Sequence, residues 1–324
     1  MKKSKVSVLA VLVLCLSLLL PACAAERPGR TAPYKIYHVV KSTGTQFWLS
    51  DFAGANAAKS EYGVELIIVG PDTEEEYERQ NELIAMAVAD GADAIVFSAI
   101  SYTGNAAAID AAADAGVKIV VIDGDVDSDK VDVRIGTDNL QAGRMTGTAV
   151  LNTDEQEIHV GIVNFDKESR NGQEREAGLR EVLEQDARVQ SVTTINVNAN
   201  AEDARFGAEL LLNEHPEINV LVGLNEPLAV GVGIAVASRG QAGKVRVVGF
   251  DTNVQCVEMM RDGVISALIA QNPYAMGYLG VEYAWKLLEG ETFDGSEWVD
   301  TATTLIDPEN MFTQESQRML FAFG

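Results

Sequence analysis

The chain is poor in the residues that most often carry catalysis and metal binding. Its 324 residues include three cysteines and three histidines, namely Cys15, Cys23, Cys256, His38, His159 and His215. The histidines are scattered, and no HExxH or CxxC motif occurs. We therefore expect no metal site and no Cys–His nucleophile. Cys15 and Cys23 both lie at the N-terminus and Cys256 stands alone in the rest of the chain, so we expect no internal disulfide and expect Cys256 to fill the core.

Positive charge is also scarce. Lysine and arginine number 25 against 48 aspartates and glutamates, which gives a formal net charge of -23. An acidic surface repels phosphate backbones, so the composition argues against a nucleic acid partner.

Only one hydrophobic run is long, and it lies at the N-terminus. The residues MKKSKVSVLAVLVLCLSLLLPAC combine a basic head, an apolar stretch and small residues before Cys23. We interpret 1–22 as a secretory signal peptide. The end of this segment resembles a bacterial lipobox, which implies cleavage before Cys23 and a diacylglycerol thioether on its sulfur. Residues 23–33 would then be the lipid anchor and a polar tether. The alternative is an uncleaved N-terminal anchor.

Apolar runs of strand length alternate with helix-period segments through the rest of the chain. The runs lie at 34–40, 64–69, 93–97, 117–122, 158–164, 190–196, 218–223, 245–249 and 264–270. The helical segments lie at 47–61, 74–90, 103–115, 171–184, 202–214, 228–239 and 253–262. Alternating Val/Ile runs and amphipathic helices predict an α/β fold with parallel sheets. So many units favour two doubly wound, Rossmann-like lobes, with an eight-stranded βα barrel as the alternative.

Polar or aromatic residues follow most of these strands, where ligands bind in open α/β sheets. They are Thr45, Gln46, Phe47, Trp48, Ser98, Asp123, Asn225, Asp251, Gln271 and Asn272. A sugar hydroxyl donates and accepts hydrogen bonds, and the C–H face of a sugar packs on an aromatic ring, so amides, carboxylates and aromatics suit a sugar. An anionic ligand would need Arg, Lys or a glycine nest, which we do not find at the strand ends. Taken singly, each residue also fits a helix cap or a turn.

Several motifs carry a resemblance to a known family. GTQFW, VIDGDVDSDKVDVRIGTDNLQAGR, NGQEREAGL, GLNEPLAVG, VVGFDTN and IAQNP occur in this order. In order and spacing they resemble the periplasmic sugar-binding proteins of the ribose-binding type, over most of the chain after the signal. The resemblance implies a type I periplasmic-binding-protein fold, with a sugar in the cleft between two lobes joined by three crossovers. The N-terminal lobe would comprise 34–138 and 272–301, and the C-terminal lobe 139–271 and 302–324.

The resemblance also implies which residues bind the ligand. Phe47 and Trp48 would stack on the sugar, Ser98 and Asp123 would bind its hydroxyls, and Gln271 would reach it from the hinge. The C-terminal lobe would add Gln173, Asn225 and Asp251.

Three positions depart from the ribose binders of the family. Gly124 and Gln173 stand where those proteins carry arginines, and Ser98 stands where they carry asparagine. Losing two guanidinium groups removes bidentate contacts, so another aldose, or a cyclic polyol such as inositol, fits at least as well as ribose. Arg170 or Arg175 is a partial substitute, although Arg175 equally well faces its own helix surface.

We therefore predict an extracytoplasmic solute-binding lipoprotein. It would be a monomer without cofactor or enzymatic activity that delivers a monosaccharide or cyclic polyol to the membrane subunits of an ABC sugar permease. The alternative partner is a sensor kinase or chemoreceptor. A glycosidase using Asp123 and Asp251 is disfavoured because neither lies in a segment that suggests a raised pKa. The run DGDVDSDKVD at 123–132 lacks the glycine and the final glutamate of an EF-hand, so we expect no calcium there.

Overall fold

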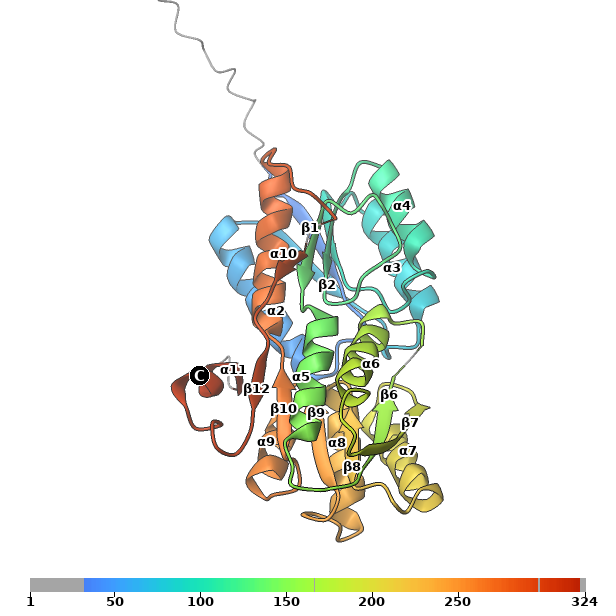
Figure 1. Ribbon diagram of the computed structural model, residues 1–324. Coiled ribbons are helices and arrows are strands. Elements are labelled where there is room, and N and C mark those ends of the chain that lie inside the picture. The colour runs from blue at the N-terminus through green and yellow to red at the C-terminus, as the bar shows by residue number, and fades with distance from the viewer. Residues whose placement is uncertain (1–31, 166, 297, 321–324) are drawn as a thin grey trace, which may run out of the picture. The chain divides into compact units, whose positions relative to one another are not determined.

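Two six-stranded sheets, each flanked by helices, form the body of the protein (Figure 1). The structure is a computed structural model that describes residues 32–165, 167–296 and 298–320. The described residues from Tyr34 onward belong to one compact unit. The predicted signal peptide, Cys23 and nearly all of the predicted tether therefore lie outside the described residues. Within the described part, no helix has the length and apolar character needed to cross a membrane.

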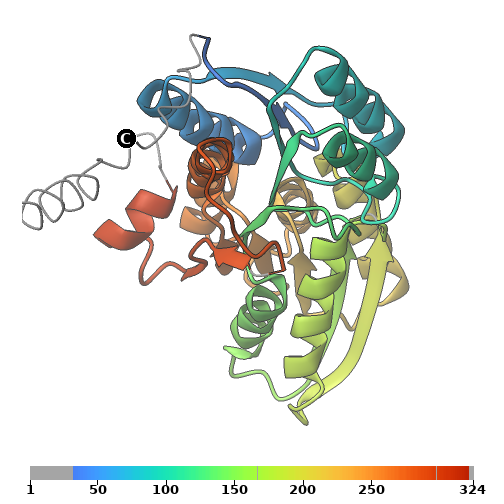
Figure 2. The same ribbon diagram turned by 90° about the horizontal axis from the view of Figure 1, so that it is seen from above.

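The first sheet, with its helices, is called the N-lobe here. Its strands, all parallel, run in the order β11-β5-β4-β3-β1-β2. They are β1 (Lys35–Val39), β2 (Glu65–Val69), β3 (Ala94–Phe97), β4 (Lys118–Ile122), β5 (Val133–Gly136) and β11 (Trp298–Asp300). Its helices are α2 (Gln46–Tyr62), α3 (Tyr77–Ala89), α4 (Ala106–Asp114) and α10 (Pro273–Leu288). Helices α2 and α10 cover one face of the sheet, and α3 and α4 cover the other (Figure 2).

The second sheet forms the C-lobe. Its order is β12-β10-β9-β8-β6-β7, and only β12 runs antiparallel to its neighbour. The strands are β6 (Ile158–Asn164), β7 (Val189–Asn196), β8 (Val220–Gly223), β9 (Arg246–Phe250), β10 (Ala267–Ala270) and β12 (Thr304–Ile306). The helices are α5 (Asn139–Leu151), α6 (Arg170–Leu183), α7 (Ala201–Glu214), α8 (Glu226–Ser238), α9 (Val254–Arg261) and α11 (Gln314–Leu320).

This architecture confirms the predicted α/β fold of two doubly wound lobes, and the barrel alternative is wrong. The chain crosses from one lobe to the other in three places, from β5 to α5, from β10 to α10 and from β11 to β12. The predicted crossovers fall in these connections. Helix α10 returns to the N-lobe and packs tightly on α2, where a Cβ on Gly277 would lie 2.0 Å from the carbonyl oxygen of Asp51.

Five elements escaped the sequence patterns altogether, namely strands β5, β11 and β12 and helices α5 and α11. Strands β5, β11 and β12 have three or four residues each, which is too short to show a hydrophobic period. In helix α5, glycines that its packing requires interrupt the hydrophobic pattern of the sequence, although the helix itself is continuous. A Cβ on Gly143 would lie 2.2 Å from the carbonyl oxygen of Arg175 in α6, so only glycine allows the two helices to approach this closely.

Candidate functional site

The carboxyl ends of the two sheets face a shared narrow cavity of about 30 Å³, room for little more than a water molecule. Six of the eight predicted ligand-binding residues line it, namely Phe47, Trp48, Asp123, Asn225, Asp251 and Gln271. Ser98 and Gln173 do not. The cavity is also lined by Arg175, which the sequence analysis named as a partial substitute, and by residues that it did not single out, among them Lys41, Glu74, Asn171 and Glu226.

Phe47 and Trp48 form an aromatic wall at the start of α2. Thr45 caps this helix, because its hydroxyl accepts a hydrogen bond from the Trp48 amide. The two rings meet edge to face with centroids 5.0 Å apart. Trp48 is almost fully buried, and its indole Nε1 donates to Oε1 of Glu74 at 3.1 Å. The pair is therefore more enclosed than a loop position suggested, and it is fixed partly by a carboxylate.

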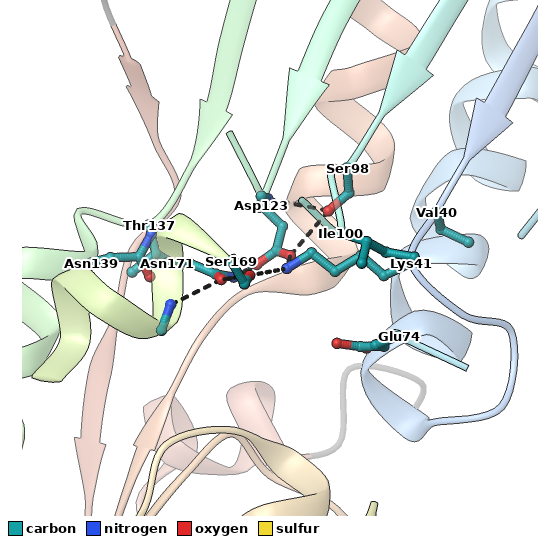
Figure 3. A network of polar contacts seen from close by, with 12 residues as sticks. Val40, Lys41, Glu74, Ser98, Ile100, Asp123, Thr137, Asn139, Ser169 and Asn171 are labelled. Carbon is teal, nitrogen blue, oxygen red and sulfur yellow. Dashed lines mark hydrogen bonds and ion pairs between the residues drawn. The ribbon is translucent and has the colours of Figure 1, made fainter. Parts of the chain in front are cut away.

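Asp123 is held by donors from three segments (Figure 3). Its Oδ2 accepts from Ser98 Oγ at 3.1 Å and lies 3.2 Å from Lys41 Nζ, while its Oδ1 accepts from Asn171 Nδ2 at 3.3 Å. Ser98 thus orients Asp123 and does not itself reach the cavity.

Lys41 corrects the expectation that no cation lies at the strand ends. It comes two residues after β1, is 3% exposed, and its Nζ also lies 3.4 Å from the Ser169 hydroxyl in the C-lobe. Its position just past a strand was the available signal, but the sequence does not show which partner compensates its charge.

Asp251 occupies the matching place in the C-lobe. Its Oδ1 accepts from Gln271 Nε2 at 2.6 Å and its Oδ2 from the Glu226 amide at 3.0 Å. Burial raises the pKa of this carboxyl to about 7, although Arg175 opposes the shift. The expectation that nothing here raises a pKa is therefore wrong.

Asp123 and Asp251 share a rare backbone conformation. Their φ angles are 50° and 67°, and they are the only non-glycine residues with positive φ in the part of the chain that the structure describes. In each case the amide donates to the neighbouring strand, to Ile135 for Asp123 and to Ile269 for Asp251. Asp tolerates the left-handed region better than most residues, and such conformations concentrate at functional sites. The two lobes therefore present equivalent carboxylates from equivalent turns.

Asn225 has a capping role as well as a place in the cavity wall. Its Oδ1 accepts from the Leu228 amide at 3.0 Å and so caps α8. Asn225 therefore caps α8, as the alternative interpretation expected, and it also lines the cavity.

Helix α6 presents different residues from those expected. Gln173 is exposed, and its amide donates to the carbonyl of Lys167 outside the cavity. Asn171 and Arg175 line the cavity instead. The spacing of four between them puts both on one face of the helix, and position 173 points away from that face. This periodicity was visible in the sequence and favours Arg175 over Gln173.

Arg175 is buried, and its guanidinium group is bonded within the protein. Its guanidinium donates to Asn139 Oδ1 at 2.9 Å, to the Leu224 carbonyl at 3.0 Å and to Gln271 Oε1 at 2.9 Å. The group also stacks over Phe250, 4.0 Å from the ring centroid. Burial lowers the pKa of Arg175. Its alternative orientation toward the helix surface is wrong.

Arg170 lies at the rim of the cleft and not among the residues that line the cavity. It pairs with Asp125 and Glu174, each at 2.8 Å. Asp125 also pairs with Arg134, at 2.8 Å, so the acidic run at 123–132 is tied to cations of the chain. No group of His, Cys, Asp and Glu arranged to hold a metal ion occurs among the described residues.

Comparison with known proteins places this geometry in context. A family model described as periplasmic binding protein domain matches residues 36–292. The D-ribose/D-allose-binding protein of Pseudomonas aeruginosa is 30% identical over 292 residues, which cover 87% of this chain and 90% of that protein. The ribose import binding protein of Bacillus subtilis is 26% identical, over 86% of this chain and 92% of that protein. A carbohydrate transporter solute-binding protein from Agrobacterium radiobacter, solved with D-arabinose, superposes with a TM-score of 0.86 at 27% identity, covering 90% of this chain and 100% of that one.

Proposed function

The chain belongs to the periplasmic binding protein family, and from this membership and the cavity we propose that it captures a monosaccharide or a cyclic polyol between its lobes and delivers it to an ABC sugar permease. Its relatives and structural neighbours are extracytoplasmic sugar-binding transport proteins and not enzymes. The glycosidase alternative for Asp123 and Asp251 is therefore wrong.

The observation that carries the proposal is the make-up of the cavity wall. An aromatic pair, three side-chain amides and two carboxylates from equivalent turns converge where the two sheets meet. Aromatic faces take the C–H surface of a sugar ring, while amides and carboxylates take its hydroxyls. We assign ligand contact to the six predicted residues in the wall, together with Asn171 and Arg175. Ser98 is assigned a positioning role.

Binding requires the lobes to part, since the cavity is far smaller than a sugar. The ligand would dock on one lobe, and hinge rotation at the three connections would bring the other lobe over it. On closure its hydroxyls take over donors and acceptors that now bond across the cleft, such as Asn171 to Asp123. A ligand that leaves one of these buried groups unpaired loses about 1–3 kcal/mol of binding free energy.

Lipid attachment at Cys23 would keep the protein next to its permease. The lipobox-like sequence before Cys23 supports this part of the proposal. A sensor kinase or chemoreceptor remains the alternative recipient of the loaded protein, and the genes that adjoin this one distinguish the two.

The test is a thermal-shift screen of the purified protein against pentoses, hexoses, inositols and disaccharides, with amino acids and short peptides as the comparison set, followed by titration calorimetry. A ligand that binds only the folded state raises the melting temperature, by an amount that grows with its concentration. We expect a stabilising monosaccharide or cyclic polyol. Stabilisation by amino acids or peptides alone would overturn the proposal.

A further inference from the structure

The cavity wall carries an excess of negative charge. Its ionisable side chains are four carboxylates and two cations, listed as Glu74, Asp123, Glu226, Asp251, Lys41 and Arg175. If all are charged, the wall has two more negative charges than positive ones. Neutral sugars are often bound through carboxylates, so an excess of negative charge does not by itself indicate a cationic ligand. What matters is whether each carboxylate has a positively charged partner within the protein.

Two of the four carboxylates are compensated by the protein itself. Asp123 lies 3.2 Å from Lys41 Nζ and 3.9 Å from Arg175 Nη2. Glu226 accepts hydrogen bonds from the amides of Gln46 and Phe47 at the start of α2. The N-terminus of a helix carries a partial positive charge, so this carboxylate is also stabilised.

The other two carboxylates have only neutral donors. Asp251 is bonded by the Gln271 side chain and the Glu226 amide, which occupy both of its oxygens. Glu74 accepts one bond, from the indole of Trp48, on Oε1. In the part of the chain that the structure describes, no Lys, Arg or His nitrogen lies within 4.0 Å of either carboxylate. Burial raises the pKa of both groups, and the charges of Lys41 near Glu74 and of Arg175 near Asp251 oppose this shift without reversing it.

Glu74 is the one of the pair that can accept a further partner. It lies in the turn between β2 and α3, and Figure 3 shows its carboxylate turned toward the space beside Lys41. Its Oε2 has no hydrogen-bond partner within the described residues. The indole N–H of Trp48 holds Oε1 of this carboxylate, which leaves Oε2 as the atom that can accept from a ligand.

We propose that the preferred ligand is a sugar with a free amino group, and that its ammonium pairs with Glu74 beside Trp48. This inference rests on the sugar-binding function proposed above and narrows it to amino sugars. A hydroxyl also donates to Glu74, but it adds no charge opposite to that of the carboxylate, whereas an ammonium supplies both the donor and the charge. An acidic sugar would add a third uncompensated charge.

The test compares matched ligands by titration calorimetry. D-glucosamine, D-galactosamine and D-mannosamine are each set against the neutral parent hexose and the N-acetyl derivative. We expect at least one amino sugar to bind at least tenfold more tightly than both of its neutral counterparts. Glu74→Gln removes this preference, and Glu78→Gln, an exposed glutamate on α3, serves as the charge-matched control that retains it. The ratio of two affinities does not depend on how much of a variant is folded.

The outcomes separate the two proposals. If a neutral sugar or polyol binds at least as tightly as every amino sugar, the inference is overturned and the proposed function stands. If no sugar or polyol of any kind binds, both are overturned. An amino-sugar preference that survives in Glu74→Gln overturns the assignment of the ammonium to Glu74.

Discussion

The amide nitrogen of Phe47 in the N-lobe lies 2.7 Å from Oε2 of Glu226 in the C-lobe. This hydrogen bond joins the first turn of α2 to the first turn of α8 across the cleft. The amide of Gln46 donates to the same carboxylate at 3.3 Å, and the Gln46 side chain in turn accepts from the Val254 amide at 3.0 Å. The three bonds tie the closed lobes together at the aromatic wall.

Replacing Glu226 by alanine should therefore favour the open form. A charge-assisted bond at a helix N-terminus contributes about 1–2 kcal/mol, so ligand affinity should fall by a comparable free energy. Small-angle scattering of the ligand-free protein should show a larger radius of gyration. Glu202→Ala, in the exposed first turn of α7, is the control. Unchanged scattering and affinity in Glu226→Ala would mean that this contact does not hold the lobes closed.

Trp48→Phe keeps an aromatic ring but deletes the indole donor to Glu74. We expect binding to weaken by about 1 kcal/mol, the usual contribution of one hydrogen bond, with most of the stability retained. The fluorescence change on ligand binding should disappear, since the reporting indole is gone. Trp285→Phe, on α10 and stacked on Tyr62 away from the cavity, should retain both the affinity and the signal. Wild-type affinity in Trp48→Phe would mean that the indole N–H does not contribute to ligand binding.

Asp251 should make the protein less stable as the pH rises. Its folded-state pKa of about 7 lies above the ordinary value of 3.8, so the native state holds a proton that the unfolded state has released. The free energy of unfolding should then fall as the pH rises from about 4 to about 7, by up to about 4 kcal/mol in total through this group.

Asp251→Asn should flatten that dependence, and asparagine tolerates the positive φ of this position. Urea denaturation over the pH range measures the effect. Asp129→Asn, at an exposed position, is the control and should follow the wild type. A pH dependence in Asp251→Asn equal to that of the wild type would contradict the prediction.

Arg175 and Gln173 give a direct contrast within α6. Arg175→Ala removes a buried cation that faces Asp123 and Gln271, and such losses typically cost about 3–5 kcal/mol of stability. Gln173→Ala changes an exposed side chain and should leave both stability and ligand affinity close to the wild type. Denaturation and calorimetry on both variants decide the point. A large loss of ligand affinity in Gln173→Ala would mean that Gln173 contacts the ligand after all.

Cys23→Ala tests the anchor independently of the sugar site. If Cys23 carries the diacylglycerol, the variant should leave the membrane fraction and retain wild-type ligand affinity in solution. Membrane association that persists in the variant would favour the uncleaved N-terminal anchor.

Much of the fold was predictable because strands that are buried on both faces of a sheet consist almost entirely of apolar residues. The runs IVVI, after the first residue of β4, and VLVG in β8 are apolar throughout, as strands covered by helices on both sides must be. Strand β11, with the residues WVD, is short and partly exposed at the sheet edge, so its composition carries no such record. Its place depends on the parallel pairing with β5.

The site was predictable to the extent that it follows the strand ends. Asp123 and Asp251 come directly after β4 and β9, and topology alone brings such positions to one edge of a sheet. Lys41, Glu74 and Arg175 could not be assigned in this way. Whether a charged side chain is buried depends on the partners it meets, and Lys41 meets Asp123, which is 82 residues farther along the chain.

The sequence by itself determined two covered parallel sheets, the acidic surface and the row of polar residues at the strand ends, because hydrophobic periodicity and composition are local properties. Only the tertiary structure decided which carboxylates of the cavity wall are charge-compensated. Asp123 is compensated by Lys41 and Glu226 by the start of α2, whereas Glu74 has the neutral indole of Trp48, and all three pairings depend on how distant segments pack. The free energy of a buried charge depends on those neighbours, and no local pattern encodes it.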